Sequence, residues 1–446
     1  MEHKLLKRYP IGNPRRRWRQ DRFILSLASP APMGLAEKSS LTHRKLRRGV
    51  KTAMDAGFNL LGCLWADPET ALEIVRTAES LGGSVLFQDL RRYGGMGHKN
   101  IFCETNDYEG AIRELLPWKC VKGHILWDEP ILPEHLEETR RMVDYCEAVR
   151  PDLLPYTVAN PDYNKLCSWE KKAYAPYIDS FLDVIDPAQM SFDHYPVGRP
   201  EYTPEVQLDN STIWSDLEIV RRAAQKRGIP FWFYYQGQHF TWHTIDYSFR
   251  HTMARSMAYA GVLHGAKGLE CYTEFDGYVD PDTGRPGLFF EEQKRLNEEL
   301  RNLGGTLMAL ECLRVIHDES LMKDHPAMEG VRTPLSESEL LSSTPVKHYK
   351  GKLARRISVS EHKDAYGNRY LMVLNRDFDV EAHTSLVLKQ PSHVYEVSKE
   401  DGEQYLLYEE TEQFCIHIAP GDLRLFRIQP ATEKPYTVEY YLEKTE

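Results

Sequence analysis

Residues 123–158 read GHILWDEPILPEHLEETRRMVDYCEAVRPDLLPYTV and contain one complete strand–helix–strand unit. The runs 125–127 and 154–158 are short and apolar, which is typical of buried strands. Between them, over 133–149, apolar residues recur at the helical period and charged residues fill the other face. The stretch therefore predicts two parallel strands joined by an amphipathic helix.

The same unit recurs from about residue 23 to about residue 310, with a new strand every 25 to 40 residues or so. The predicted strands are 23–27, 59–65, 85–88, 125–127, 154–158, 190–192, 230–235 and 268–272. The predicted helices are 43–56, 69–81, 133–149, 168–184, 213–227, 249–264 and 289–303. Eight such units indicate an α/β fold, a (β/α)8 TIM barrel. A doubly wound open sheet is the alternative, but Ser29-Pro30-Ala31-Pro32 is no glycine-rich phosphate loop.

The pattern changes after about residue 340, where short strands alternate with turn signals and no helical period is visible. The predicted strands there are 370–375, 385–388, 405–408, 414–418 and 423–428. They indicate a small antiparallel all-β sandwich. The predicted organisation is an N-terminal arm (1–22), the barrel (23–318), a linker (319–345), the sandwich (346–432) and a tail (433–446).

Composition and charge restrict the partners. The chain has 446 residues, 41% of them hydrophobic, and a net charge of -10, which argues against nucleic-acid and anionic-membrane partners. The basic run 15–19 favours a solvated arm packed across a barrel end over a polyanion site. No apolar stretch could span a membrane and no signal peptide is visible. The chain as written is expected to be cytoplasmic, and secretion stays open if a leader precedes it. Nothing in the sequence indicates an oligomeric state.

The cysteines give no sign of a metal or disulfide framework. All eight are scattered singly, without a Cys-x-x-Cys pair, and several lie in apolar runs where a thiol behaves as a small hydrophobic group. We therefore expect no metal and no cofactor.

Polar and aromatic residues follow the predicted strands at their carboxyl ends, where barrel enzymes gather their active residues. They are Gln88, Asp89, Trp127, Asp128, Glu129, Asp193, Tyr195, Tyr235, Gln236, Gln238, Glu270, Tyr272 and Glu274. Carboxylates and amides match sugar hydroxyls, and aromatic rings match sugar faces, so this inventory predicts a carbohydrate site.

The segment 123–130 (GHILWDEP) resembles the strand-four acid/base segment of retaining clan-A glycoside hydrolases, which usually read Asn-Glu-Pro there. With Asp-Glu-Pro it resembles more closely a group of barrel proteins described as family 42 or β-galactosidase-like. The segments 191–196 (SFDHYP) and 250–269 are further matches, and 374–377 (LNRD) and 419–422 (APGD) resemble the accessory sandwich of such hydrolases. The resemblance covers about residues 20 to 430 as an order of elements.

The resemblance implies that Glu129 is the general acid. The alternative is a structural role, in which Glu129 caps the helix that begins near Pro133. The second carboxylate departs from the family, because the seventh strand ends in Gln236 where retaining clan members have a nucleophilic Glu. An amide cannot attack an anomeric carbon, so Gln236 is expected to contact the substrate or position a water or a carboxylate. Asp193 and Glu270 are equal candidates for the missing partner, with Glu274 behind them.

The remaining rim residues are predicted to bind the substrate. Asp128 takes the place of the family's Asn and would accept a hydrogen bond from the sugar 2-hydroxyl. The stacking candidates are Trp127, Tyr195, Tyr235 and Tyr272, besides Trp232 and Trp242, although core packing is the default for each alone. Polar contacts are expected from Gln88, Asp89, Gln238 and Glu274. The histidines His194, His239 and His243 are expected to be structural.

The leading hypothesis is a glycoside hydrolase that cleaves an oligo- or polysaccharide by paired-carboxylate catalysis. Retention or inversion depends on whether the two carboxyl groups lie about 5 Å or about 6.5 to 9.5 Å apart, and the sequence leaves both open, like the sugar and the linkage. The alternative is a non-catalytic carbohydrate-binding barrel, favoured by the missing strand-seven Glu. A phosphosugar isomerase or aldolase is the weakest reading, because Gln236-Gly237-Gln238 is a poor phosphate loop.

Overall fold

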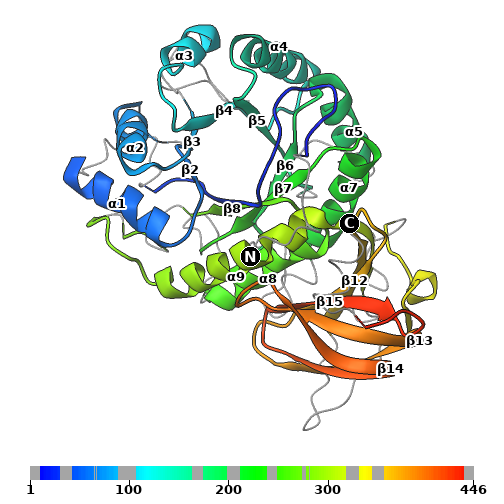
Figure 1. Cartoon of the computed structure of the whole chain (residues 1–446). Coiled ribbons are helices and arrows are strands. Elements are labelled where there is room, and N and C mark those ends of the chain that lie inside the picture. The colour runs from blue at the N-terminus through cyan, green and yellow to red at the C-terminus, as the bar shows by residue number, and fades with distance from the viewer. Residues whose placement is uncertain are drawn as a thin grey trace.

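The computed structural model describes residues 11–30, 43–64, 66, 68–88, 107–162, 174–197, 211–238, 249–273, 278–280, 282–317, 331–343 and 356–435. Its first part is a closed barrel of eight parallel strands in chain order, with β8 paired to β1 (Figure 1). The strands are β1 (Ile24–Leu27), β2 (Leu60–Gly62), β3 (Val85–Phe87), β4 (Val121–Asp128), β5 (Leu154–Ala159), β6 (Met190–His194), β7 (Phe231–Gln236) and β8 (Gly268–Tyr272). The predicted TIM barrel is confirmed.

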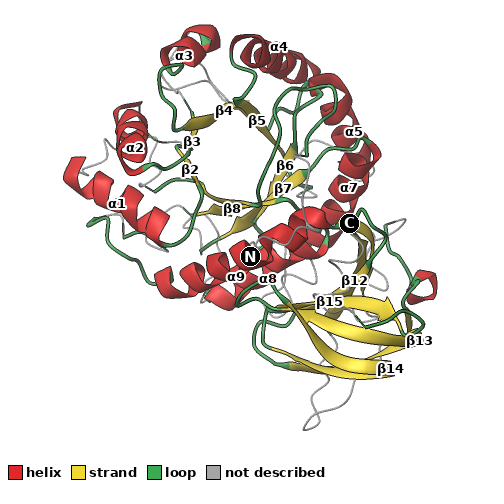
Figure 2. Ribbon diagram, in the orientation of Figure 1, coloured by secondary structure: helices red, strands yellow, loops and turns green. Residues whose placement is uncertain are grey.

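Helices surround this barrel on its outside (Figure 2). They are α1 (His43–Asp55), α2 (Pro68–Leu81), α3 (Tyr108–Glu114), α4 (Pro133–Val149), α5 (Tyr174–Ile185), α7 (Ile213–Lys226), α8 (His251–Leu263) and α9 (Phe290–Ala309). The sequence did not predict α3, because seven residues are too few to show a helical period. Within the described part of the chain, no helix is long and apolar enough to cross a membrane.

The strands alternate between the barrel interior and the layer beneath the helices. An interior cluster contains Leu60, Leu86, Ile125, Tyr156 and Trp232, and their strand neighbours pack outward against the helices. The register sets Glu270 of β8 beside Ser26 of β1 and Tyr234 of β7. Interior residues of neighbouring strands therefore lie in layers, and the uppermost layer forms the candidate site.

The N-terminal segment 11–22 crosses the amino-terminal end of the barrel (dark blue in Figure 1). Trp18 packs edge-on against Trp232 at 6.1 Å, and the indole nitrogen of Trp232 donates to Gln20 at 2.9 Å. Arg16 is buried and donates to the backbone carbonyl of Asp186 at 2.6 Å. The basic run thus packs against the barrel through its aromatic and arginine side chains.

The second part is an antiparallel sheet of seven strands, with β14 paired to β13 at its side. The strands are β9 (Glu311–His317), β10 (Leu341–Ser343), β11 (Ile357–Lys363), β12 (Arg369–Asn375), β13 (Ala382–Val397), β14 (Gln404–Ile418) and β15 (Leu423–Pro430). The long strand β13 has register shifts in its middle, pairs with β10 at Val387 and Leu388, and pairs with β15 in its second half. The curled sheet encloses its own core around Leu371, Val373, Phe414 and Phe426, which agrees with the predicted sandwich.

The boundary between the two parts differs from the predicted one. Strand β9 lies inside the range 23–318 assigned to the barrel, yet it pairs with β11, for example Ile316 with Val359. The reason is that β9 follows α9 almost directly, with only the extended residue Leu310 between them and no turn signal. A short 3-10 helix (Leu335–Glu337) and β10 occupy part of the predicted linker.

Candidate active site

Strand β4 brings two carboxylates to the carboxyl end of the barrel through an irregularity. Its register with β5 shifts between Ile125 and Trp127, where β4 has one residue more than its partner. Such a bulge reverses the alternation of side chains. Trp127 consequently turns outward and stacks on His135 of α4 at 4.8 Å. Asp128 is only 8% exposed, and its charge acts on Tyr234 in the barrel interior. This differs from the expectation that Trp127 faces the sugar.

Glu129 follows the strand in a left-handed backbone conformation, with φ of 55°. Its backbone N–H donates to Val158 of β5 at 3.0 Å, and its side chain is half-buried. A non-glycine residue held at positive φ is uncommon and is found more often at functional sites. Glu129 is not the cap of α4, because that helix begins at Pro133 and its N-cap position is Leu132. The structural alternative for Glu129, a helix cap, therefore does not apply.

Strand β6 supplies the third carboxylate. Ser191, Asp193 and Tyr195 share the inward face, and Asp193 is 7% exposed. His194 points the other way and contacts Asp216 of α7 at 2.8 Å, in the structural role expected for it. A purely structural Asp193 would need a cation beside it, but Arg250 and Arg255 of the neighbouring α8 region pair with Asp379 and Asp422 instead.

The surroundings of Asp193 favour its protonated form. Burial raises the pKa of this carboxyl group well above its usual value, and the nearby charges of Glu129 and then Asp128 raise it further. A hydrogen bond with Tyr195 acts in the opposite direction but does not compensate. Its Oδ1 has no hydrogen-bond partner among the described residues. The ends of β4 and β6 thus hold three interacting carboxyl groups, and burial together with the charges of Glu129 and Asp128 favours the protonated form of Asp193.

Glu270 lies deeper in the barrel and is fully buried. Its Oε2 accepts hydrogen bonds from Ser191 at 2.6 Å and from Tyr156 at 2.8 Å. Burial raises the pKa of Glu270 to about 8, although these two hydrogen bonds lower it in part. Its charge is not among the main influences on Asp193, so the structure separates the two candidates for the second carboxylate: Asp193 adjoins Glu129, and Glu270 sits below them.

Aromatic rings line the interior beside these carboxyl groups. Tyr195 stacks on Tyr272 of β8 at 4.8 Å with an interplanar angle of 23°, and Tyr234 meets Tyr272 edge-on at 6.3 Å. The buried hydroxyl of Tyr234 has no hydrogen-bond partner among the described residues. The sequence prediction chose Tyr235 in place of Tyr234. Tyr235 faces outward, where its hydroxyl group and the side chain of Gln293 on α9 are 3.1 Å apart.

The other predicted residues fall into three groups. The side chain of Gln236 makes its hydrogen bonds to the backbone. Its amide oxygen accepts from the N–H of Val197 at 2.9 Å, and its amide nitrogen donates to the carbonyls of Val197 at 2.8 Å and Gln238 at 2.9 Å. It therefore holds the segment after β6 against the end of β7. Gln88 and Gln238 are buried at the ends of β3 and β7. Asp89, Glu274, Trp242, His239 and His243 lie outside the described residues.

Three residues of the interior were missed by the sequence prediction: Tyr156, Ser191 and Tyr234. The alternation of side chains along a strand could have identified two of them. Ser191 is two residues before Asp193 and Tyr234 is two residues before Gln236, so each shares a face with a residue that was predicted. Tyr156 carries no motif, and only the closure of the barrel brings β5 opposite β8.

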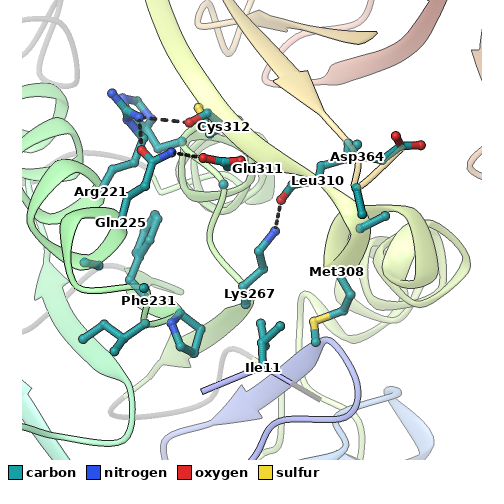
Figure 3. A pocket seen from close by; sticks show the side chains of 18 of the residues that line it. Ile11, Arg221, Gln225, Phe231, Lys267, Met308, Leu310, Glu311, Cys312 and Asp364 are labelled. Carbon is teal, nitrogen blue, oxygen red and sulfur yellow. Dashed lines mark hydrogen bonds between the residues drawn. The ribbon is translucent and has the colours of Figure 1, made fainter. Parts of the chain in front are cut away.

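A pocket of about 590 Å³ lies at the opposite end of the barrel, between the last turns of α7, α8 and α9 and the turn at 364–366 (Figure 3). Phe231, the first residue of β7, and Lys267, just before β8, line it. Lys267 donates to the carbonyls of Leu307, at 2.6 Å, and Leu310, as lysines do at helix ends. This face of a TIM barrel serves stability, so the pocket is separate from the carboxylate site.

No protein-family model matches the chain, and no curated protein matches it. Solved structures do. A candidate α-galactosidase of Bacteroides fragilis NCTC 9343 has a TM-score of 0.52 at 9% identity, over 92% of this chain and 81% of that one. A β-L-arabinopyranosidase of family GH27 from Geobacillus stearothermophilus has a TM-score of 0.50 at 11% identity, over 93% and 98%. The chain is therefore similar in fold to these two structures. Neither structure is described as a family 42 protein, so that narrower resemblance stays a prediction.

Proposed function

We propose that the protein is a glycosidase whose acid/base pair is formed by Asp193 and Glu129 at the carboxyl end of the barrel. One observation carries the proposal: a buried carboxyl group on β6 whose pKa is raised by burial and by two carboxylates at the end of β4. Two carboxyl groups driven to opposite protonation states are what glycosidic bond cleavage requires. The likeness of its fold to those of a candidate α-galactosidase and a β-L-arabinopyranosidase supports this reading.

Asp193 is the proton donor in this proposal. A carboxylic acid that stays protonated at neutral pH can donate to the departing glycosidic oxygen but cannot act as a nucleophile or a base. The raised pKa of Asp193 fits that role. The resemblance implies the reverse, with Glu129 as the acid, and the experiment below distinguishes the two assignments.

Glu129 is the ionised partner. It lies at the open end of β4, is half-buried, and is the strongest charged influence on Asp193. It would either attack the anomeric carbon or activate a water, according to the distance between the carboxyl groups in the substrate complex. Asp128 has two roles in this proposal. Its negative charge favours a positively charged transition state, and its carboxylate accepts a hydrogen bond from a sugar hydroxyl.

The substrate class is a glycoside whose ring packs against aromatic side chains. The stacked pair Tyr195 and Tyr272 provides an apolar face beside Asp193. Glu270 is too deep to join the reacting pair in this proposal, and we assign it the role of fixing Tyr156 and Ser191 beneath the site.

The test is a panel of aryl glycosides and oligosaccharides assayed with the wild-type protein, Asp193→Asn, Glu129→Gln and Asp128→Asn. Glu137→Gln, an exposed substitution on the outside of α4, is the matched control. Removing the proton donor should slow substrates with poor leaving groups by about 10²- to 10⁴-fold and spare activated aryl glycosides. We expect this pattern for Asp193→Asn, and a loss on both kinds of substrate for Glu129→Gln.

The first product's anomeric configuration, read by NMR, then assigns Glu129. Retention makes it the nucleophile, and azide should rescue Glu129→Gln on activated substrates with a glycosyl azide as product. Inversion makes it the base. The opposite leaving-group pattern would restore Glu129 as the acid. No turnover on the panel together with measurable sugar binding would favour the non-catalytic barrel.

A further inference from the structure

The paired strands β13 and β14 place two histidines side by side on the surface of the C-terminal sheet. His383 and His417 are directly opposite each other in the antiparallel register. Their strand neighbours Ala382 and Ile418 are buried in the core of the sheet, so the two imidazoles point outward. The ring centroids are 4.4 Å apart. Side chains paired in this way are held in one geometry by the ladder of backbone hydrogen bonds on either side.

A carboxylate completes the group. Glu381 precedes β13 by one residue and is two residues from His383, so it reaches the same face of the sheet. Its Oε2 lies 2.9 Å from Nε2 of His417 and 4.0 Å from Nε2 of His383. One ligand atom from each of the three residues lies within 4.8 Å of the others. Among the described residues this is the one group of His, Cys, Asp and Glu side chains that meets that condition.

This arrangement has the chemistry of a metal site. Two imidazole nitrogens and one carboxylate oxygen are a ligand set that suits Zn²⁺ and its neighbours in the first transition series. Bonds of about 2.0 to 2.2 Å to a central ion place the ligand atoms of a tetrahedral site a little over 3 Å apart. Half-exposed side chains such as these can close the remaining distance by small rotations.

The surrounding charge permits a cation. Arg424 approaches the backbone carbonyl of His417 at 3.4 Å, but its guanidinium is paired with Glu396 at 2.6 Å. The Glu381 carboxylate is therefore the charged group that pairs with both imidazoles.

We propose that Glu381, His383 and His417 form a surface site for a divalent transition-metal ion of the Zn²⁺ type, with the fourth position open to water. The site departs from the expectation of no metal, which rested on sequence spacing. His383 and His417 are 34 positions apart, and only the register of β13 with β14 brings them together. The ion would fasten β14, which lies off the main strand path of the sheet, to the start of β13.

The test is a Zn²⁺ titration of the full chain without a polyhistidine tag, stripped with a chelator and followed by calorimetry at pH 7.5. We expect one equivalent of Zn²⁺ to bind. Loss of a residue that merely hydrogen-bonds to a metal ligand commonly weakens binding about 10- to 100-fold, so His417→Ala, His383→Ala and Glu381→Gln should each weaken it at least tenfold. Cys415→Ser is the control, because Cys415 is exposed on β14, binds metals readily as a thiol, and is no part of the group.

A second readout does not depend on heat of binding. Zn²⁺ should raise Tm of the wild-type protein in a concentration-dependent way and slow amide exchange of Ile416 and Ile418, and both effects should vanish in the His383→Ala/His417→Ala variant. Equal Zn²⁺ binding by the wild type and the double variant, or binding that is lost with Cys415→Ser, would overturn the proposal. Circular dichroism of each variant establishes that the substitutions leave the fold intact.

Discussion

The hydroxyl group of Tyr156 donates a 2.8 Å hydrogen bond to Oε2 of Glu270 in the middle of the barrel, although the two residues are 114 positions apart. Ser191 donates to the same oxygen, and Oε1 has no hydrogen-bond partner among the described residues. Two neutral donors do not compensate a buried charge fully, so burial raises the pKa of Glu270 to about 8. This environment therefore favours the protonated form of Glu270 at neutral pH.

The titration of Glu270 should make stability depend on pH. Its pKa rises from 4.5 to about 8 on folding, so between these values the folded protein binds a proton that the unfolded chain has lost. The free energy of unfolding should fall as the pH rises from about 4.5 to about 8, by on the order of 5 kcal/mol. Glu270→Gln keeps an acceptor for both hydroxyl groups and removes this dependence. Urea unfolding at pH 5.5 and 8.5 should show the variant gaining several kcal/mol relative to the wild type. Parallel pH curves for the two proteins would contradict the assignment, and Glu137→Gln should leave the curve unchanged.

A second pH effect concerns activity. Asp193 must be protonated to act as the donor, so activity should fall as the pH rises through its raised pKa. The charge of Asp128 is one cause of that rise. Asp128→Asn should lower the pKa of Asp193 and move the alkaline limb of the kcat/KM profile to lower pH, by roughly one unit. Carbon-13 NMR of labelled aspartate gives the same pKa without turnover. A limb that stays in place or moves to higher pH would exclude the proposed electrostatic coupling.

The sequence predicted the barrel well because each of its units carries its own signal. Apolar runs such as 154–158 and helical periods such as 133–149 are local patterns, and they correspond closely to β5 and α4. Inward and outward faces were harder to predict. In β4 the bulge at Trp127 depends on the register with β5, and no local pattern announces it.

The candidate site was predicted only in part, because some of its residues carry a local sequence signal and others are brought together by the closed barrel. Glu129 and Asp193 were found because polar residues at strand ends are visible in the sequence, whereas the choice between Asp193 and Glu270 required the barrel to close. The register alone does not decide it, since both carboxylates pair with Tyr234 of β7, but in the closed barrel Glu270 meets Tyr156 and Ser191, and Ser191 lies two residues before Asp193 on β6.

Gln236 offers a test of how the end of β6 is held. Its side-chain amide makes three hydrogen bonds to the backbone of Val197 and Gln238. Gln236→Glu keeps the acceptor but replaces both donated bonds by contacts between a carboxylate and carbonyl oxygens. Each unsatisfied buried polar group costs about 1 to 3 kcal/mol, so we expect at least about 2 kcal/mol of destabilisation in urea and a fall in kcat/KM. The exposed Gln413→Ala is the control. A stable Gln236→Glu with full activity would mean that the segment after β6 is held by other contacts.

A partly buried charge cluster lies at the junction between the barrel and the sheet, with side chains 15% to 19% exposed. Asp422 accepts from Arg255 of α8 at 2.9 Å and from Lys399. Burial acts to raise the pKa of Asp422, but the charges of Lys399 and Arg255 outweigh it, and the pKa falls below the usual 3.8. The stabilisation is therefore present above pH 3.8 and is lost as the pH falls through the lowered pKa.

Asp422→Asn leaves Arg255 and Lys399 with Glu299 as their shared anion, at 2.5 and 3.7 Å, but removes the charged acceptor that both also contact, so it should cost about 2 kcal/mol in urea unfolding at pH 7. The matched control is Asp379→Asn. Asp379 pairs with Arg250 across the same junction, but both side chains are nearly half exposed, at 48% and 44%. An exposed pair contributes no more than about 1 kcal/mol. At pH 3 the difference between Asp422→Asn and the wild type should shrink, because the unfolded wild-type chain then binds a proton at this carboxyl group, which the folded protein with its lowered pKa resists. Equal losses for the two variants at pH 7 would show that burial gives the Asp422 cluster no special part in joining the two domains.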